Sequence, residues 1–292
     1  MITSLLDVPA PAKLNLFLHV IGRRADGYHL LQSPFVLVDW CDTLHFERRA
    51  DGRLARHDLG PALPADDLTL RAARALQQAS GTAWGADISV DKQLPWGAGM
   101  GGGSSDAATA LLALNRLWGL HWPRERLLPL AAKLGADVPF FVGGHNAFVE
   151  GIGEKLTPMA LRPRWFAVVK PAASIDTAGI FGDPALVRDT DPAILSGSLA
   201  DDCVCEELAG GYGRNDLQPV AQSRCPEVAQ AARWLEQRFG NSRMTGSGSA
   251  VFARAGTGAQ PMATFPADLL PPGWAGRMCR SLEQHPLAGW AG

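Results

Sequence analysis

The sequence predicts a soluble globular protein that combines strands with helices and carries a site for phosphate. Three observations support this prediction. Residues 12–20 alternate apolar and polar side chains as a half-buried strand does, residues 107–118 repeat apolar side chains at helical spacing, and a glycine-rich loop opens directly into that helix. The 292 residues are enough for one large or two ordinary domains, and a hydrophobic content of 47% supplies ample core.

The composition argues against several classes of protein. A formal net charge of -2 gives no electrostatic reason to expect nucleic acid or an anionic membrane as a partner. No apolar run reaches the roughly 18 residues of a membrane span, and no basic residue precedes the short apolar run at residues 1–8, so we expect a cytoplasmic protein. The five cysteines lack a C-x-x-C pair, and we expect all of them to be reduced thiols: Cys41, Cys203, Cys205, Cys225 and Cys279. The oligomeric state is not predicted.

The first strand, residues 12–20, places Lys13 and Asn15 next to each other on its polar face. An ordinary solvent-facing edge explains this pair as well as a functional site does. A polar turn follows, in which Tyr28 and His29 either pack on the sheet or contact a ligand, with the ring of Tyr28 stacked on a base.

Further elements are expected along the whole chain. We expect strands at residues 31–47, 88–92, 147–150 and 165–169, helices at 68–78, 127–134 and 227–239, an irregular connection at 51–66, turns at 143–144 and 151–153, a domain boundary near 162–164, and no long regular helix in the proline-rich residues 256–275. Gly135 and Gly240 are expected to cap the helices that they follow.

Residues 97–107 form the glycine-rich loop, with five glycines in seven positions. Glycines expose backbone N–H groups, and the start of a helix adds the positive end of its dipole, so the segment is typical of an anion site. The hydroxyl groups of Ser104 and Ser105 add donors or a magnesium ligand. The loop lacks the Gly-Lys-Ser/Thr ending of a P-loop and the acidic partner of a Rossmann unit. Asp106 must point away from a bound phosphate or contact it through a metal. A flexible linker is the alternative, which the periodic helix disfavours.

Two other segments leave alternatives open. Asp137 lies between a helix end and an apolar run stiffened by Pro139, where it is either functional or a cap on backbone N–H groups. Residues 244–252 place a second loop of small residues before a strand, as a hairpin turn or as a ligand loop.

Several of these segments occur in the order seen in the GHMP small-molecule kinases, which the chain resembles over nearly its whole length. They are Pro11-Ala12-Lys13-Leu14-Asn15-Leu16, Asp26-Gly27-Tyr28-His29, Leu94-Pro95 with Gly99-Met100-Gly101-Gly102-Gly103-Ser104-Ser105-Asp106-Ala107-Ala108, Gly135-Ala136-Asp137-Val138-Pro139, and Met244-Thr245-Gly246-Ser247-Gly248. The glycine-serine loop marks the superfamily, and the first, second and fourth segments together indicate a member that phosphorylates a cytidylyl acceptor.

The resemblance implies an α+β, two-domain GHMP kinase fold. Residues 1–160 would form an N-terminal domain like ribosomal protein S5 domain 2, and residues 161–292 a ferredoxin-like C-terminal domain, with the substrates between them. It also implies the reaction, which is ATP-dependent phosphorylation of the 2-hydroxyl of 4-diphosphocytidyl-2-C-methyl-D-erythritol to give the 2-phosphate and ADP, in non-mevalonate biosynthesis of isopentenyl diphosphate.

The resemblance further implies the residues of the site. ATP would contact Lys92, Pro95, Gly97, Gly99, Met100, Gly101, Gly102, Gly103, Ser104 and Ser105, with its adenine near residues 66–68. The acceptor would contact Asn15, Tyr28, His29, Phe181 and Thr245, with its cytosine stacked between Tyr28 and Phe181 and hydrogen-bonded at His29.

Asp137 would act as the base toward the 2-hydroxyl. Lys13 would orient Asp137 or stabilise negative charge on the attacking oxygen. Mg²⁺ would bridge the phosphates, with Ser104 or Ser105 as its candidate protein ligand.

Two alternatives to this function remain. The chain would be a GHMP kinase that acts on homoserine, mevalonate or a sugar, or a nucleotide-binding regulator that kept the fold and lost the chemistry. The presence of both Lys13 and Asp137 argues against the regulator.

Overall fold

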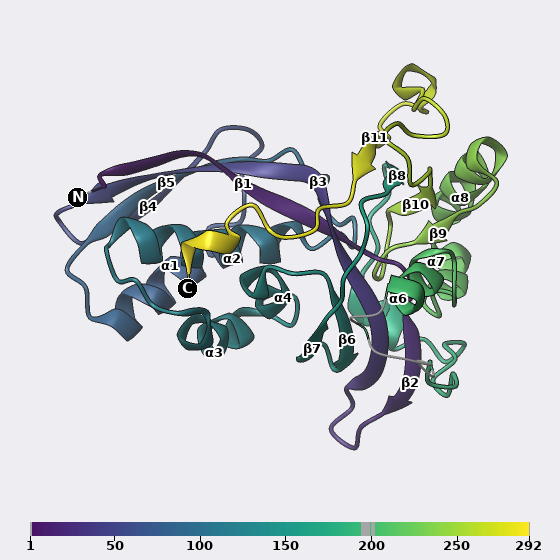
Figure 1. Ribbon diagram of the computed structural model, residues 1–292, viewed down its shortest axis with the longest axis horizontal. Helices are drawn as coiled ribbons and strands as arrows, with labels where there is room; N and C mark the ends of the chain where they lie inside the picture. Colours follow the sequence, from purple (N-terminus) through teal and green to yellow (C-terminus); the bar gives the residue numbers. More distant parts are fainter. Residues whose placement is uncertain (1, 194–198, 200–201, 292) are drawn as a thin grey trace.

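The computed structural model describes residues 2–193, 199 and 202–291, and it contains two β-sheets that are each covered by helices (Figure 1). The strands of the seven-stranded sheet are β1 (Ser4–Asn15), β2 (His19–Arg23), β3 (His29–Arg49), β4 (Leu54–Asp58), β5 (Gly85–Asp91), β6 (Ala147–Gly151) and β7 (Lys155–Pro158). The helices that accompany it are α1 (Leu68–Ser80), α2 (Gly102–Leu117), α3 (Arg124–Leu134) and α4 (Val138–Gly143).

The second sheet has four strands in the order β11-β8-β10-β9. These strands are β8 (Trp165–Lys170), β9 (Arg243–Met244), β10 (Val251–Arg254) and β11 (Ala275–Arg280). Its helices are α5 (Thr177–Phe181), α6 (Asp202–Ala209), α7 (Gln218–Arg224) and α8 (Pro226–Phe239), and short 3₁₀ turns lie at η1 (Ala267–Leu269) and η2 (Ala288–Trp290).

Strand β3, which is 21 residues long, organises the first sheet. Residues 35–47 of β3 pair with β1, residues 43–49 pair with β5 on the opposite edge, and residues 29–35 pair with β2 and β6. Strand β4 adds to β5 in parallel. Because one long strand carries all these partners, the segments that enter the site from β1, β2 and β3 have a common frame.

The described residues form four buried clusters, and three of them hold the two sheets and their helices together. Helices α1 to α4 cover one face of the first sheet, and the alanines of α2 (Ala107, Ala108, Ala110 and Ala113) let that helix pack closely on its neighbours. Helices α7 and α8 cover the second sheet in the same way. A third cluster joins the two sheets, where Leu14 and Val36 pack with Phe166, Phe252 and Met100 of the glycine loop. The two sheets therefore share a core directly behind the glycine loop.

Helix boundaries follow the expected local signals. Asp67 caps the start of α1 by accepting a hydrogen bond from the Leu70 amide, and Gly81 ends the helix in the left-handed conformation. Helix α8 begins with Pro226 and ends at Gly240, also left-handed. The predicted helices correspond to α1, α2, α3 and α8, and the predicted strands to β3, β5, β6 and β8. Residues 256–275 contain no α-helix, and their only helical element is the short 3₁₀ turn η1.

Two predictions about the first sheet are wrong. Residues 12–20 do not form one half-buried strand, because the chain leaves β3 after Asn15, and the amide of Leu18 then donates to the carbonyl of Arg214 near the second sheet. Both faces of this segment are consequently buried, including Lys13 at 3% exposure. Residues 51–66 are not wholly irregular, since they contain β4.

The C-terminal segment returns from the second sheet to the first (Figure 1). The amide of Leu282 donates to Leu37, the amide of His285 donates to Gly144, and Leu287 and Ala291 join the core beneath the first sheet. The chain thus crosses between the sheets once after β7 and again after β11. A single cut at residue 160 separates the sheets but not this returning segment, and the boundary itself stays a prediction.

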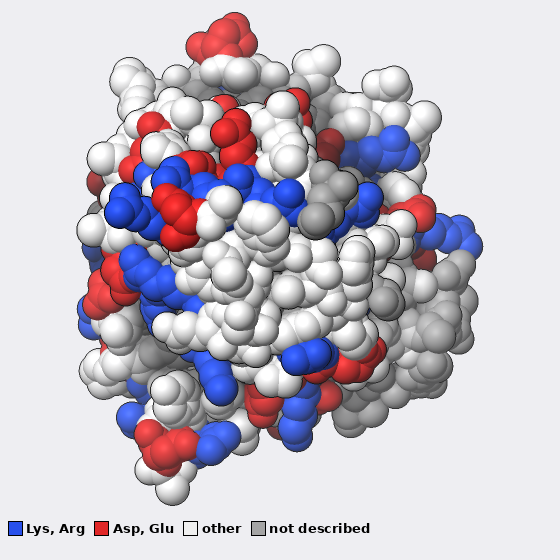
Figure 2. All heavy atoms as spheres, turned by 90° about the vertical axis from the view of Figure 1, so that its left-hand side faces the viewer, with Lys and Arg blue, Asp and Glu red and all other residues white. Residues whose placement is uncertain are grey.

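The surface and the cysteines agree with the composition. On the face seen in Figure 2, basic and acidic side chains lie next to one another. In the described part of the chain, no helix is both long and apolar enough to cross a membrane. Cys41, Cys225 and Cys279 carry free thiols, and the side chain of Cys203 lies outside the described residues.

Candidate active site

Two cavities meet at the glycine loop. One, of about 680 Å³, extends from Lys13 and Asp137 to Tyr28, His29 and Phe181, and we call it the acceptor cavity. The other, of about 440 Å³, is lined by residues 63–68 and by the loop that precedes α2, and we call it the nucleotide cavity. Gly99 and Gly101 line both cavities, so groups bound on the two sides can approach each other at these glycines.

The glycine loop needs glycine for both conformation and space. Gly97, Gly99 and Gly101 have φ angles of +63°, +70° and +74°. A Cβ atom on Gly99 would lie 2.5 Å from the carbonyl oxygen of Thr245. The loop is this close because it is hydrogen-bonded to the second loop of small residues, where the amides of Ser249 and Ala250 donate to Gly97 and Ala98. Residues 244–250 therefore support the glycine loop from behind.

Helix α2 begins at the junction with open N–H groups. Its N-cap is Gly101, and among the described residues no side chain caps it. Ser104 in the first turn lines the nucleotide cavity. Ser105 does not face a cavity: it is fully buried, and its hydroxyl donates to the carbonyl of Pro11 at 2.7 Å. The prediction that Ser105 contacts phosphate or metal is therefore wrong, because its position in the helix turns it toward β1.

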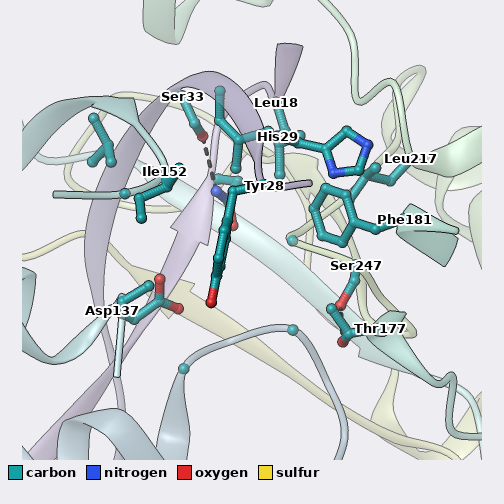
Figure 3. Close-up of a pocket in the computed structure, with 18 of the residues that line it drawn as sticks. Leu18, Tyr28, His29, Ser33, Asp137, Ile152, Thr177, Phe181, Leu217 and Ser247 are labelled. Atoms are coloured by element: carbon teal, nitrogen blue, oxygen red, sulfur yellow. Dashed lines mark hydrogen bonds between the residues drawn. The ribbon is translucent and has the colours of Figure 1, made fainter. Parts of the chain in front are cut away.

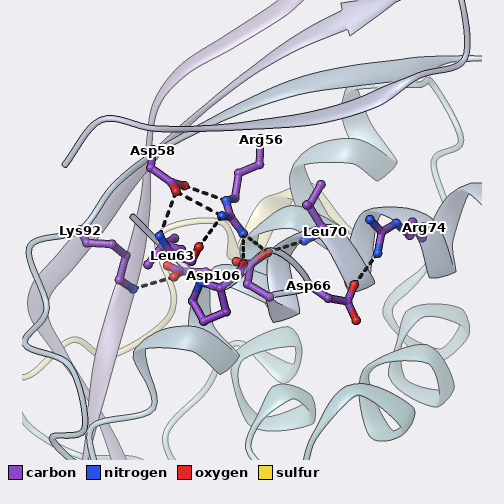
Figure 4. A network of polar contacts seen from close by, with 10 residues as sticks. Arg56, Asp58, Leu63, Asp66, Leu70, Arg74, Lys92 and Asp106 are labelled. Carbon is purple, nitrogen blue, oxygen red and sulfur yellow. Dashed lines mark hydrogen bonds and ion pairs between the residues drawn. The ribbon is translucent and has the colours of Figure 1, made fainter. Parts of the chain in front are cut away.

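Lys92 occupies the nucleotide cavity, but its charge is already compensated. Its ammonium group contacts Asp106 at 2.6 Å, which Figure 4 shows, and it also contacts Asp42. Burial opposes the charged form, yet Asp106 and Asp42 raise the pKa of Lys92 above its usual value. Burial raises the pKa of Asp106, and the nearby carboxylate of Asp42 raises it further. Lys92 lowers this pKa but does not cancel the rise, because the two carboxylates share one cation. The carboxylate of Asp106 thus neither points to solvent nor opposes phosphate as a free charge.

Asp42 was missed by sequence reasoning, although it is the one acidic residue of β3 that is fully buried within the described chain. Its second oxygen accepts the amides of Gln93 and Leu94, both at 2.7 Å. Asp42 and Lys92 therefore fasten the segment before the glycine loop to Asp106 in the helix after it. The sequence offered no clear signal for it, because Asp39 and Glu47 lie in the same strand and are not buried.

The far wall of the nucleotide cavity is built around Arg56 (Figure 4). This buried side chain pairs with Asp58 and with Asp67, and it donates to the carbonyls of Leu63 and Pro64. The carboxylate of Asp67 is therefore engaged by Arg56 and by the helix cap. Opposite this wall, Trp96 is 65% exposed at the edge of the cavity.

Lys13 and Asp137 are brought together as predicted. Their Nζ and Oδ2 atoms are 3.6 Å apart, with the Lys13 side chain almost fully buried and the Asp137 side chain 31% exposed. Asp137 stands at the start of α4, and its side chain caps no backbone N–H of the described residues, which removes the capping alternative. Burial lowers the pKa of Lys13 although Asp137 opposes this shift.

The polar atoms around Lys13 fix its position. Its ammonium group donates to Asn15 Oδ1 at 2.5 Å and lies 4.3 Å from the centre of the Phe35 ring. Its backbone amide donates to the carbonyl of Met100 in the glycine loop. Lys13 therefore links the first strand, the carboxylate of Asp137 and the glycine loop.

Thr245 supports Asn15 and does not face the cavity. It is fully buried, its hydroxyl accepts the amide of Asn15 at 2.9 Å, and it donates to Asn15 Oδ1 at 3.3 Å. The prediction that Thr245 contacts the acceptor is wrong because the second loop turns this side chain toward β1. Asn15 itself lines the acceptor cavity and donates to Ser33.

Aromatic side chains line the end of the acceptor cavity away from Asp137. In Figure 3, His29 and Phe181 lie on one side of the hollow and Asp137 on the other. The rings of His29 and Phe181 are 5.0 Å apart, and Tyr28 is 61% exposed at the cavity. Arg188, which sequence reasoning missed, donates to His29 Nε2 at 3.1 Å. Burial, Arg188 and Arg23 lower the pKa of His29.

Comparison with known proteins agrees with this geometry. The model of the GHMP kinases N-terminal domain matches residues 67–145, which include the glycine loop and Asp137, and that of the GHMP kinases C-terminal domain matches residues 205–261. A 4-diphosphocytidyl-2-C-methyl-D-erythritol kinase of Methylibium petroleiphilum is 66% identical over 99% of both chains. One of Albidiferax ferrireducens is 56% identical, over 99% of this chain and 96% of that one.

Solved structures agree as well. A crystal structure of 4-(cytidine 5'-diphospho)-2C-methyl-D-erythritol kinase superposes with a TM-score of 0.78 at 34% identity, over 95% of this chain and 98% of that one. The homoserine kinase of Cytophaga hutchinsonii, with a TM-score of 0.68 at 17% identity over 98% of this chain and 96% of that one, shares the fold. The α+β fold and the site thus define a GHMP kinase, and within that class the chain belongs to the 4-diphosphocytidyl-2-C-methyl-D-erythritol kinase family.

Proposed function

We propose that this protein transfers the γ-phosphoryl group of ATP to the 2-hydroxyl of 4-diphosphocytidyl-2-C-methyl-D-erythritol, giving the 2-phosphate and ADP in non-mevalonate isoprenoid precursor biosynthesis. The observation that carries the proposal is the Lys13–Asp137 pair at the point where the acceptor cavity meets the glycine loop. The names of the close relatives support the same reaction.

ATP is proposed to lay its phosphates on the open N–H groups at the start of α2. Its base would enter the space between residues 63–68 and Trp96. Since the charge of Lys92 is already shared by Asp106 and Asp42, backbone dipoles supply the local attraction for phosphate.

Asp137 is proposed to accept the proton of the 2-hydroxyl as the oxygen bonds to the γ-phosphorus and the bond to the ADP oxygen breaks. Lys13, held by Asn15 and packed on Phe35, orients the carboxylate and places positive charge beside the attacking oxygen. Its burial keeps water away from the ammonium group, while the carboxylate of Asp137 stays open to the cavity.

Mg²⁺ is proposed to accompany ATP. Oxygen donors suit this ion, and the nucleotide cavity offers the hydroxyl of Ser104 and the Oδ1 atom of Asp106, which lacks a hydrogen-bond partner among the described residues. The described residues contain no cluster of three or more His, Cys, Asp or Glu side chains for a metal. Bound there, the ion would offset phosphate charge.

The acceptor is proposed to be recognised through its cytosine. The base would stack between Tyr28 and Phe181 and bond to His29, while Asn15 contacts the methylerythritol end near Lys13. We also retain as proposals a small-molecule substrate without a nucleic-acid or membrane partner, a cytoplasmic location, and a domain boundary between β7 and β8 near residues 160 and 161.

A phosphoryl-transfer assay tests the proposed function. Purified protein with Mg²⁺ and ATP is offered 4-diphosphocytidyl-2-C-methyl-D-erythritol, methylerythritol phosphate, mevalonate and homoserine, and the products are followed by phosphorus NMR. A new monoester signal is expected with the cytidylyl acceptor alone and is expected to vanish when the metal is chelated. Transfer to a different acceptor would overturn the substrate, and binding of ATP without transfer to any acceptor would favour the regulator.

A further inference from the structure

Arg188 joins two walls of the acceptor cavity. It donates through Nε to His29 Nε2 at 3.1 Å, and its terminal nitrogens donate to the backbone carbonyls of Leu186, Phe181 and Asp183 at 2.9, 3.0 and 2.7 Å. His29 begins strand β3, whereas Phe181 ends helix α5 beside the second sheet. One half-buried side chain therefore ties the histidine to the segment that carries the facing aromatic ring.

The direction of this hydrogen bond fixes the tautomer of His29. A guanidinium group is a donor only, so the Nε2 atom that it contacts must be the acceptor. A neutral imidazole then carries its proton on Nδ1. Nδ1 has no hydrogen-bond partner among the described residues, and His29 lines the acceptor cavity. Burial and the charges of Arg188 and Arg23 disfavour a second proton on the ring. His29 therefore offers an N–H donor.

We propose that Arg188 is a positioning residue that holds His29 as a hydrogen-bond donor and thereby makes the acceptor cavity select cytosine over uracil. The N3 atom of cytosine carries no hydrogen and accepts, whereas N3 of uracil carries a hydrogen and would oppose the His29 donor. The O2 atom accepts in both bases and does not distinguish them. Because a donor facing a donor leaves both groups unpaired, the wrong base loses affinity. The inference rests on the proposed function for its ligand, but the tautomer of His29 does not depend on it.

Arg224 provides a matched control. It pairs with Asp183 at 2.6 Å, in the same segment that Arg188 holds, and among the described residues it makes no hydrogen bond to His29. Removing Arg224 loosens this segment without changing the hydrogen bond to the imidazole. Arg188→Met and Arg224→Met therefore separate a role in fixing the tautomer from a role in holding the segment.

The first experiment measures the tautomer directly. Protein labelled with ¹⁵N-histidine is studied by NMR without ligand, and the signals of His29 are assigned with His29→Gln. We expect the proton on Nδ1 in the wild type and in Arg224→Met, and a loss of this preference in Arg188→Met. A proton on Nε2 in the wild type, or an unchanged tautomer in Arg188→Met, would overturn the inference whether or not the protein is a kinase.

The second experiment measures selectivity with cytidine 5'-diphosphate and uridine 5'-diphosphate as the ligands, by calorimetry. The wild type and Arg224→Met are expected to bind the cytidine compound about tenfold or more tightly, because an unpaired buried donor weakens binding of the uridine compound by that factor. Arg188→Met is expected to lose most of this preference while it still binds ATP, which shows that it is folded. Equal binding of the two diphosphates by the wild type would contradict the proposed selectivity. Binding of neither would contradict the proposed acceptor, and the NMR experiment would then still test the tautomer of His29.

Discussion

The two cavities are built in different ways, although they meet at the same two glycines. The nucleotide cavity is lined by two stretches of chain, residues 63–68 and 92–106, which both belong to the first sheet and its helices. The acceptor cavity is lined by β1, β3 and the segment before α4, which belong with the first sheet. It is also lined by α5 and by the loop at residues 246–247, which belong with the second sheet. The cavity proposed for ATP is thus local in sequence, and the cavity proposed for the acceptor depends on how the two sheets are joined.

The two cavities also differ in how their charged side chains are paired. In the nucleotide cavity, buried charges compensate one another, as Lys92 does with Asp106 and Arg56 with Asp67, so that backbone N–H groups remain to bind phosphate. In the acceptor cavity, Asp137 is partly open, and the Nδ1 atom of His29 has no hydrogen-bond partner among the described residues. We therefore expect side-chain changes to affect chemistry most in the acceptor cavity, and backbone changes to affect the junction.

The largest effect is expected for Asp137→Asn. Loss of the base should lower kcat by about 10² to 10⁴-fold and leave the affinity for ATP nearly unchanged. Steady-state kinetics and ATP titration measure both. Asp66→Asn is the control, because this carboxylate lines the nucleotide cavity, is 66% exposed and pairs only with Arg74 among the described residues. Turnover of Asp137→Asn within a few-fold of the wild type would remove Asp137 from catalysis.

A backbone change at the junction is expected to come next. Gly99→Ala places a Cβ atom 2.5 Å from a carbonyl oxygen at a φ of +70°, and the left-handed conformation alone costs about 1–3 kcal/mol of unfolding free energy. Denaturant unfolding measures the loss. Gly103→Ala is the matched control, since its nearest neighbour would be Leu68 at 3.9 Å and helix formation favours alanine. Equal stability of the two variants would refute the steric account.

A pair of aromatic variants tests whether the cavities act separately. Tyr28→Ala should weaken binding of the cytidylyl acceptor by about 1–3 kcal/mol, as loss of base stacking does, and should leave ATP binding unchanged. Trp96→Ala should weaken ATP by about 1 kcal/mol and leave the acceptor unchanged, since its ring lies at the other cavity. Calorimetry with each ligand gives both values. An effect of either variant on the opposite ligand would break the separation.

The smallest effect concerns acid stability of the returning C-terminal segment, which holds the end of α4 behind Asp137. Burial lowers the pKa of His285 to about 3, from the value of 6.5 that an unburied histidine has. The unfolded chain therefore takes up a proton below pH 6.5 while the native chain does not, and native stability falls as the pH falls. Between pH 7 and pH 6 this histidine should remove about 0.7 kcal/mol.

Urea unfolding at the two pH values measures this loss. His285→Asn should reduce the difference between them, whereas His121→Asn, at an exposed position with a φ of +50° that Asn tolerates, should not. If His285→Asn keeps the full difference, other groups must account for it.

The sequence alone determined the phosphate loop and the elements around it. Five glycines before a periodic helix can serve few other purposes, because both the left-handed angles and the open helix start are local properties of the chain. The alanine-rich pattern of α2 and the caps of α1 and α8 are local in the same way, which is why these helices agree with their predictions.

Only the tertiary structure decided which side chains face a ligand. Ser105 and Thr245 fit their motifs but are turned inward by contacts with β1, from segments 94 and 230 residues apart. Asp42 and Arg188 belong to no recognised motif, and they matter because distant segments place Lys92 and His29 against them. Burial and long-range partners set the roles of such polar groups, and neither is a property of the neighbouring residues in sequence.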